Sequence, residues 1–169
     1  MSSRVRLYIF DADGTLRWTA RPGAKYPLHA GEWRPMPGVA ERLRAIPFSE
    51  QGPWLAIASN QNGVAAGELS EEVAQQLITE MLREALGSLP PRTRIEMCTC
   101  DETRPCACRK PAPGLLLRLL AHFGVAAEEA LFVGDLGSDA EAARRAGVPF
   151  AYAAEFFATD ERSRPFSSE

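Results

Sequence analysis

The sequence contains no long hydrophobic run, since no apolar stretch in its 169 residues approaches the roughly 20 residues that cross a membrane. It also lacks a strong charge of either sign, because 19 Lys and Arg residues stand against 22 Asp and Glu residues, for a net charge of -3. That balance gives no general attraction to nucleic acid or to an anionic membrane. Internal repeats and low-complexity segments are absent as well. We therefore expect a soluble globular protein without a membrane partner.

The size and the composition agree with this expectation. A chain of 169 residues with 46% hydrophobic and 24% charged residues can form one domain with a full core. Residues 1–4 are polar or basic apart from Met1 and lead directly into the first apolar run, so we expect no signal peptide and a cytoplasmic location. We expect a single domain over residues 1–158, followed by a polar, frayed tail over 159–169.

Short apolar runs alternate with stretches of helical periodicity along the chain. Strands are predicted at 5–9, 54–58, 94–97, 130–134 and 148–152. Helices are predicted at 38–45, 70–86, 113–123 and 139–146. Repeated strand–helix units predict an α/β fold, namely a Rossmann-like three-layer sandwich with a central parallel sheet. Ligands of such sheets bind beyond the carboxyl ends of the strands. The intervening segment 17–37 is rich in Pro, Gly and aromatic residues and is expected to be irregular.

The helix predicted at 70–86 has the clearest boundaries. Ser70 is expected to cap its first turn, and Gly87 to end it. The residues expected to form its buried face are Val73, Leu77, Met81 and Leu82.

The first chemically informative motif runs from Phe10 to Leu16 and follows an apolar run of strand length. Asp11 and Asp13 are one residue apart, so they can divide the labour of a nucleophile and a general acid/base. Gly14 permits a sharp turn, and Thr15 offers a hydroxyl and an N–H to a phosphate. The motif therefore predicts a phosphoryl-transfer site. The alternative is an acidic turn that forms a surface metal site.

Two further motifs supply groups that suit a phosphate. Ser59 and Asn60 follow the apolar run 54–58, where a hydroxyl and free backbone N–H groups can hold phosphate oxygens. Lys110, in the segment 109–114, offers a compact positive charge to a transferring phosphoryl group. Taken alone, the first is equally a plain turn and the second a basic loop before a helix.

A fourth motif places Asp135 directly after the strand predicted at 130–134, where it should lie beside Asp11. Two carboxylates, a backbone carbonyl and water molecules suit Mg²⁺. Asp139 follows one helical turn later. It could orient Lys110 or the waters of the metal, or it could only cap the helix that begins there.

All four cysteines lie within 11 residues of one another, in the segment 98–108. Four thiolates at this spacing can bind a tetrahedral Zn²⁺, and disulfides are rare in the cytosol. With four protein ligands the zinc has no open position, so we predict a structural site that holds the loop leading to Lys110. The alternative is a set of free or cross-paired thiols. The predicted ligands are Cys98, Cys100, Cys106 and Cys108.

The four motifs, in this order, resemble those of the haloacid dehalogenase superfamily of phosphatases, in which a strand is followed by Asp-x-Asp-Gly-Thr. The resemblance extends from about residue 7 to residue 152. It implies that Asp11 attacks phosphorus to form an aspartyl phosphate, while Asp13 serves as general acid and base. It also implies that Mg²⁺ is held by the side chains of Asp11 and Asp135 and by the main-chain carbonyl of Asp13.

The same resemblance assigns the remaining roles. It implies phosphate binding by Thr15, Ser59, Asn60 and Lys110, with Asp139 and Arg109 as possible supporting residues.

The segments 60–64 and 109–114 resemble a narrower, capless branch of that superfamily. It contains histidinol-phosphate phosphatases, D-glycero-D-manno-heptose 1,7-bisphosphate phosphatases and polynucleotide 3'-phosphatases. In its zinc-binding members the usual ligand set is Cys-x-His followed by Cys-x-Cys, and this chain has Cys100 in place of the histidine. No insertion of 50 residues follows the first or second motif, so we expect no large cap domain and an open active site.

The sequence therefore predicts a Mg²⁺-dependent phosphomonoester hydrolase with a structural zinc ion, acting on a phosphorylated sugar or another small metabolite. A polynucleotide 3'-phosphatase is the alternative, since the segments 23–27 and 149–151 resemble that group; only then is nucleic acid a partner. A further alternative is an inactive, zinc-stabilised binding module. The polar and aromatic residues of the long loop either line a substrate cleft or are solvated; they include Arg17, Trp18, Arg21, Lys25, His29 and Arg34.

Overall fold

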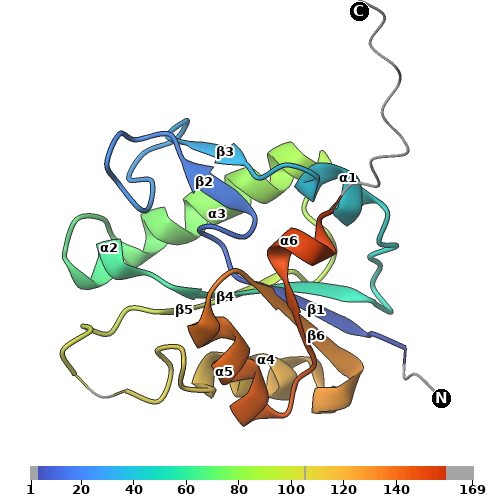
Figure 1. Cartoon of the computed structure of the whole chain (residues 1–169). Coiled ribbons are helices and arrows are strands. Elements are labelled where there is room, and N and C mark those ends of the chain that lie inside the picture. Colours follow the sequence, from blue (N-terminus) through green and yellow to red (C-terminus); the bar gives the residue numbers. More distant parts are fainter. Residues whose placement is uncertain (1–3, 105, 159–169) are drawn as a thin grey trace, which may run out of the picture.

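A five-stranded parallel sheet in the order β5-β4-β1-β6-β7 lies at the centre of the structure (Figure 1), a computed structural model that describes residues 4–104 and 106–158. Its strands are β1 (Leu7–Phe10), β4 (Trp54–Asn60), β5 (Arg94–Cys98), β6 (Ala130–Gly134) and β7 (Phe150–Tyr152). The helices are α1 (Val39–Arg44), α2 (Asn62–Ala65), α3 (Glu71–Leu86), α4 (Gly114–Phe123), α5 (Gly137–Ala146) and α6 (Ala153–Phe156), with a 3₁₀ turn η1 (Ala127–Glu129). The predicted α/β class is thereby confirmed.

Apolar side chains on both faces of the sheet form two cores. The alternation of a strand sends Leu7 and Ile9 of β1 into one core and Phe10 into the other. Helices α4 and α5 cover the first face, whereas α1, α3 and α6 lie across the second (Figure 1). The arrangement is the predicted three-layer sandwich. It places β1 in the middle of the sheet between β4 and β6, so the residues after β1 lie where strands on either side end.

The boundaries of α3 agree with the prediction, but one of its predicted core residues does not. The Ser70 hydroxyl accepts a hydrogen bond from the backbone N–H of Val73 at 3.1 Å, and Gly87 adopts a φ of 81° directly after the last turn. Val73 itself is 37% exposed, so its assignment to the buried face was wrong. The buried face is centred on Ala74 and Ile78, the positions that follow Val73 and Leu77, which places Val73 at its solvent edge.

The segment 17–37 was predicted to be irregular, and that prediction was wrong. It contains the antiparallel strands β2 (Arg17–Thr19) and β3 (Trp33–Pro35), which form a separate two-stranded sheet. Strands of three residues are too short for a period-two pattern to be visible. The four-residue helices α2 and α6 were also not predicted, because four residues are too few to show helical periodicity.

Within the described part of the chain, no helix has both the length and the apolar character of a membrane span. The segment between β1 and α1 is occupied by the β2–β3 hairpin, and the described residues form no large cap domain. The tail predicted to fray, 159–169, lies outside the described residues.

Candidate active site and zinc centre

The four motifs meet at the carboxyl edge of the sheet, around a cavity of about 560 Å³. Asp11 and Asp13 come directly after β1, and Asp135 follows the neighbouring strand β6. Lys110 enters from the loop that precedes α4. The sequence-predicted carboxylates and the lysine therefore line a single cavity, together with Asp139 from the first turn of α5.

The ammonium group of Lys110 is held by three acceptors. Its Nζ lies 2.8 Å from Asp11 Oδ1, 2.7 Å from Asp139 Oδ1 and 2.8 Å from the carbonyl oxygen of Ala58. These acceptors match the three donors of an ammonium group. Lys110 is only 4% exposed, and its burial works to lower its pKa. The attraction of Asp11 and Asp139 outweighs that effect and raises the pKa, so the lysine stays charged.

Asp139 has both of the roles that the sequence left open. One carboxylate oxygen pairs with Lys110, while the other accepts hydrogen bonds from the backbone N–H groups of Asp135 and Leu136 at 3.2 and 3.1 Å. The carboxylate therefore caps the start of α5 and also fixes the lysine. Burial raises its pKa, and repulsion from Asp11 adds to that effect.

Asp11 is buried at the floor of the cavity. Desolvation raises its pKa from 3.8 to about 6, although Lys110 works in the opposite direction. The nearby carboxylate of Asp135 contributes to the increase. A cation at this point would lower the pKa of Asp11, because it favours the charged form of the carboxylate.

The donor set at this point fits Mg²⁺. One oxygen each of Asp11, Asp135 and Asp139 lie within 4.8 Å of one another, and Mg²⁺ prefers hard oxygen ligands. Since Asp139 is engaged by Lys110 and by the start of α5, Asp11 and Asp135 are the side chains that would hold the ion. Gly14 has a φ of +85°, and a Cβ added to it would collide with the carboxylate of Asp135. The close turn after β1 therefore requires glycine at this position.

Two residues expected to bind phosphate, Thr15 and Ser59, are hydrogen-bonded to other protein groups. The hydroxyl of Thr15, a fully buried residue, donates to Asp135 Oδ1 at 3.1 Å, and a longer contact of 3.4 Å reaches Asp11. Ser59 Oγ accepts a hydrogen bond from the side chain of Gln61 at 2.6 Å. Both side chains therefore support the carboxylates or the strand end, and their contact with phosphate stays a prediction.

Asn60 fixes the backbone of the lysine. Its amide donates to the carbonyl of Lys110 at 3.1 Å and accepts from the N–H of Lys110 at 3.0 Å. These two bonds connect the end of β4 to the loop before α4, 50 residues further along the chain. The sequence offered no signal for this contact, because nothing local links the two motifs.

Asp13 lies at the side of the cavity and pairs with a buried arginine. Arg17 Nε donates to Asp13 Oδ1 at 2.8 Å, and Arg17 Nη2 donates to Asp13 Oδ2 at 3.3 Å. From the sequence, Arg17 was expected either to line a substrate cleft or to be exposed to solvent. The structure shows neither, because its side chain is 1% exposed and lies behind Asp13.

The outer wall of the cavity carries aromatic and cationic side chains. Trp18 is half-exposed, and Lys25 and Tyr26 reach the cavity from the loop between β2 and β3. Arg109 also lines the cavity, and its guanidinium donates to Asn62 Oδ1 at 2.9 Å and to Glu102 Oε1 at 2.8 Å. Part of the long loop therefore does line the site, as one of the two readings of the sequence proposed.

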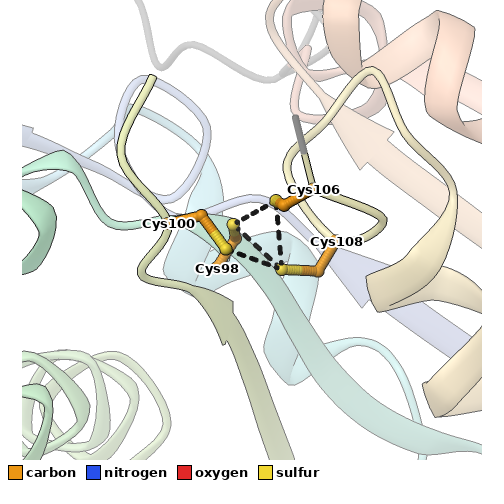
Figure 2. Close-up of side chains that lie close together, drawn as sticks. All are labelled: Cys98, Cys100, Cys106 and Cys108. Atoms are coloured by element: carbon orange, nitrogen blue, oxygen red, sulfur yellow. Dashed lines mark hydrogen bonds between the residues drawn. The ribbon is translucent and has the colours of Figure 1, made fainter. Parts of the chain in front are cut away.

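The four cysteines form a cluster outside this cavity, where β5 ends (Figure 2). All are free thiols, and one Sγ atom from each lies within 4.8 Å of the others. The separations from Cys108 Sγ are 3.0 Å to Cys98, 3.6 Å to Cys106 and 3.7 Å to Cys100, and Cys98 is 3.5 Å from Cys106. A tetrahedral zinc site with Zn–S bonds of about 2.3 Å has sulfur atoms about 3.8 Å apart. The cluster therefore fits a Cys₄ zinc ion.

Protonation differs among these thiols. Hydrogen bonding from Cys100 lowers the pKa of Cys106 to about 6, whereas burial raises the pKa of Cys98. A bound zinc ion would hold all four as thiolates, since only thiolates ligate the metal.

Hydrogen bonds connect the cysteine cluster to the loop that carries Lys110. The backbone N–H of Arg109 donates to Cys106 Sγ at 3.1 Å, one residue before Lys110. The N–H of Gly114 donates to the carbonyl of Ala107 at 2.9 Å, which joins the start of α4 to the same loop. The cluster is therefore bonded directly to the residue before Lys110, and a backbone bond holds the far end of the same segment.

Comparison with known proteins agrees with the geometry. Residues 18–147 match the family of haloacid dehalogenase-like hydrolases. The chain is 30% identical over 147 residues to the D-glycero-beta-D-manno-heptose-1,7-bisphosphate 7-phosphatase of Pseudomonas putida, across 85% of this chain and 79% of that protein. It is 33% identical over 141 residues to the enzyme of the same name from Pseudomonas aeruginosa, across 82% and 75%.

A solved structure shares the fold. The D,D-heptose 1.7-bisphosphate phosphatase from B. bronchiseptica, complexed with magnesium and phosphate, superimposes with a TM-score of 0.71 at 28% identity. The alignment covers 86% of this chain and 79% of that one. Sequence, fold and site geometry agree, and the chain belongs to the haloacid dehalogenase-like hydrolases, among the relatives of the heptose-bisphosphate phosphatases.

Proposed function

We propose that this protein hydrolyses a phosphomonoester of a sugar, with Asp11 as the nucleophile. The observation that carries the proposal is the position of Asp11. Its carboxylate lines the cavity and accepts a hydrogen bond from the ammonium group of Lys110, and Asp13 lines the same cavity two residues further along the chain. The match to the hydrolase family begins at residue 18 and so does not include Asp11 and Asp13. The roles of these two residues are therefore supported by the geometry of the site.

The chemistry has two steps. An oxygen of Asp11 attacks phosphorus in line, the bond from phosphorus to the leaving oxygen breaks, and Asp13 gives its proton to that oxygen. Asp13 then takes a proton from water, whose oxygen attacks the aspartyl phosphate. The second attack releases inorganic phosphate and restores the carboxylate of Asp11.

Lys110 supplies positive charge throughout both steps, because its ammonium is fixed beside Asp11. Asn60 and Asp139 hold the lysine from its backbone and from its ammonium group, respectively. Asp11 and Asp135 would hold Mg²⁺, which when bound neutralises phosphoryl oxygens and lowers the charge repulsion between substrate and carboxylates.

The cavity favours a substrate with a second anionic group. Lys25 and Arg109 line it in addition to Lys110, and each carries a charge that can pair with an anion, Arg109 in exchange for its contact with Glu102. The relatives named above are phosphatases of a heptose bisphosphate, a sugar with two phosphates. We propose a sugar bisphosphate of this kind as the substrate class, and a cytoplasmic place of action, where four free thiols persist.

A substrate panel tests the proposal. Release of inorganic phosphate is measured with Mg²⁺ for both anomers of D-glycero-D-manno-heptose 1,7-bisphosphate, for sugar monophosphates, for histidinol phosphate and for a 3'-phosphorylated oligonucleotide. We expect the bisphosphates to have the highest kcat/KM. A preference for the oligonucleotide would instead establish the polynucleotide 3'-phosphatase alternative, and inactivity toward every phosphoester would contradict a catalytic role altogether.

A further inference from the structure

We propose that Arg17 is a positioning residue, which fixes the carboxylate of Asp13 in the orientation that proton transfer to the leaving group requires. The inference rests on the proposed function, because it takes Asp13 as the general acid. It goes beyond that function in assigning a role to a residue that does not line the cavity.

The contact between the side chains of Arg17 and Asp13 is bidentate. Nε and Nη2 of Arg17 donate to different oxygens of Asp13, at 2.8 and 3.3 Å. A planar guanidinium matches a carboxylate in this way, whereas an ammonium group can offer only a point charge. Because both oxygens are held, rotation of the Asp13 carboxylate about its terminal bond is restricted.

The backbone fixes the arginine relative to the acid. The N–H of Gly14 donates to the carbonyl of Arg17 at 2.8 Å, and the N–H of Arg17 donates to the carbonyl of Ala12 at 3.2 Å. Arg17 is also the first residue of β2, where it is paired with Pro35 of β3. The ion pair therefore spans a closed turn whose two ends lie on β1 and on the β2–β3 hairpin.

The burial of Arg17 argues against a role in stability alone. It is among the largest fully buried side chains, and its Nη1 has no hydrogen-bond partner among the described residues. Burying a guanidinium with some of its donors unsatisfied is costly, and apolar replacements of buried ion pairs are often neutral or stabilising. The side chain of Asp13 is 21% exposed and lines the cavity, so the buried charge is directed at an acid that a substrate in the cavity can reach.

A neighbouring arginine provides a matched control. Arg34 lies on the partner strand β3, and among the described residues its guanidinium donates to the carbonyls of Gly31 and Trp33 alone. It is absent from the cavity wall and from the contacts of Asp13. R34M removes an equal charge from the same hairpin without touching the acid.

The experiment compares two substrates of similar shape and different leaving groups. p-Nitrophenyl phosphate releases a stable phenolate and needs no proton from the enzyme. Benzyl phosphate would release an unstable alkoxide, so its hydrolysis depends on protonation of the leaving oxygen by Asp13. The value of kcat/KM reports the first phosphoryl transfer, and it is measured for wild type, D13N, R17M, R17K and R34M. We expect D13N and R17M to raise the ratio of kcat/KM for the two substrates by about tenfold or more in favour of p-nitrophenyl phosphate.

R17K should change the ratio less than R17M does, since lysine keeps a positive charge beside Asp13 but lacks the bidentate guanidinium. R34M should leave the ratio unchanged. An equal loss on both substrates in R17M, with the expected pattern in D13N, would overturn the inference and leave the proposed function standing. An unchanged ratio in D13N would overturn the role of Asp13 in the proposed function and the inference with it. If R17M does not fold, as judged by circular dichroism, R17K is held to the same criterion: an unchanged ratio overturns the inference.

Discussion

At the scale of single residues, the central feature is a lysine whose three donors are all used by the protein. Lys110 meets Asp11, Asp139 and the carbonyl of Ala58, so its position is determined before any substrate arrives. Preorganised charge of this kind contributes to catalysis because it needs no rearrangement when the phosphoryl group transfers. The same contacts allow the roles of the two carboxylates to be separated experimentally.

The first prediction concerns the nucleophile. D11N should abolish phosphate release, since an amide cannot attack phosphorus as a carboxylate does. Its oxygen can still accept a hydrogen bond from Lys110, so the circular dichroism spectrum should remain that of the wild type. Trapping of a phosphorylated enzyme by rapid acid quench should succeed with wild type and fail with D11N. Substantial turnover in D11N would rule out the covalent route.

The second prediction separates the two contacts of Asp139. D139N keeps an oxygen for the N–H groups at the start of α5 but loses the charge beside Lys110, whereas D139A loses both. We expect kcat to fall about 10–100-fold in either variant, the usual cost of removing a supporting residue of this type. D139A should be less stable than D139N by about 1 kcal/mol, the value of a helix cap.

Urea unfolding and steady-state kinetics of the two variants provide the measurement. If D139N retained full activity while D139A lost it, the residue would act as a cap only, and its pairing with Lys110 would be without consequence.

Much of the site could be predicted at this scale because the motifs that carry Asp11 and Asp135 directly follow strands. Asp11 and Asp135 come directly after β1 and β6, and neighbouring parallel strands bring their ends together. The contacts of Asn60 and Arg17 could not be predicted. Asn60 reaches a residue 50 positions away, and Arg17 is a charged residue whose burial depends on the hairpin that encloses it.

At the scale of elements, we expect the order of the segment 98–108 to depend on a bound zinc ion. Its described residues form no helix or strand beyond the end of β5, and its four cysteine sulfur atoms lie within 4.8 Å of one another. Because Arg109 donates its N–H to Cys106, disorder in this segment would be transmitted to Lys110.

The third prediction tests that dependence. Protein purified without chelator should contain about one zinc ion per chain, as the four ligands imply. Removal of the metal with a strong chelator, or the substitution C106S, should lower kcat, and Mg²⁺ alone should not restore the activity of the stripped protein. Zn²⁺ together with Mg²⁺ should restore it. The measurement combines elemental analysis with kinetics after metal replacement.

D101A is the control, because Asp101 lies in the same segment and its side chain is bonded to the N–H of Thr103 rather than to the cysteines. Full activity in metal-free protein with four titratable thiols would contradict a structural role for zinc.

The elements that could be predicted are the longer ones. The strand at 130–134 was located without error, as were the capping residues of α3, because apolar length and cap chemistry are local properties. The β2–β3 hairpin was missed since each strand has three residues and its pairing depends on long-range contacts, among them Met36 with Leu16. That hairpin carries Arg17 and Trp18, so the missed element also contributes residues to the site.

At the scale of the whole molecule, stability is linked to pH and to Mg²⁺ through the carboxylates of the cavity. Folding raises the pKa of Asp11 from 3.8 to about 6 in the absence of metal. Because the folded state then binds the proton more tightly than the unfolded chain, this group favours folding at low pH, and that contribution is lost as the pH rises through about 6. Mg²⁺ has the opposite dependence, since it binds the ionised carboxylates.

The fourth prediction follows from this linkage. Mg²⁺ should raise the Tm substantially at pH 7.5 and only slightly at pH 5, where Asp11 retains its proton. At a hundredfold excess over its Kd, a ligand specific for the folded state contributes about 2.7 kcal/mol. D135N removes one of the two expected ligands and should abolish most of the gain, while R34M, remote from the carboxylates, should retain it. Differential scanning calorimetry at the two pH values, with and without Mg²⁺, measures the effect. A Tm increase that is equal at both pH values, or equal in D135N and wild type, would place the Mg²⁺ elsewhere than on Asp11 and Asp135.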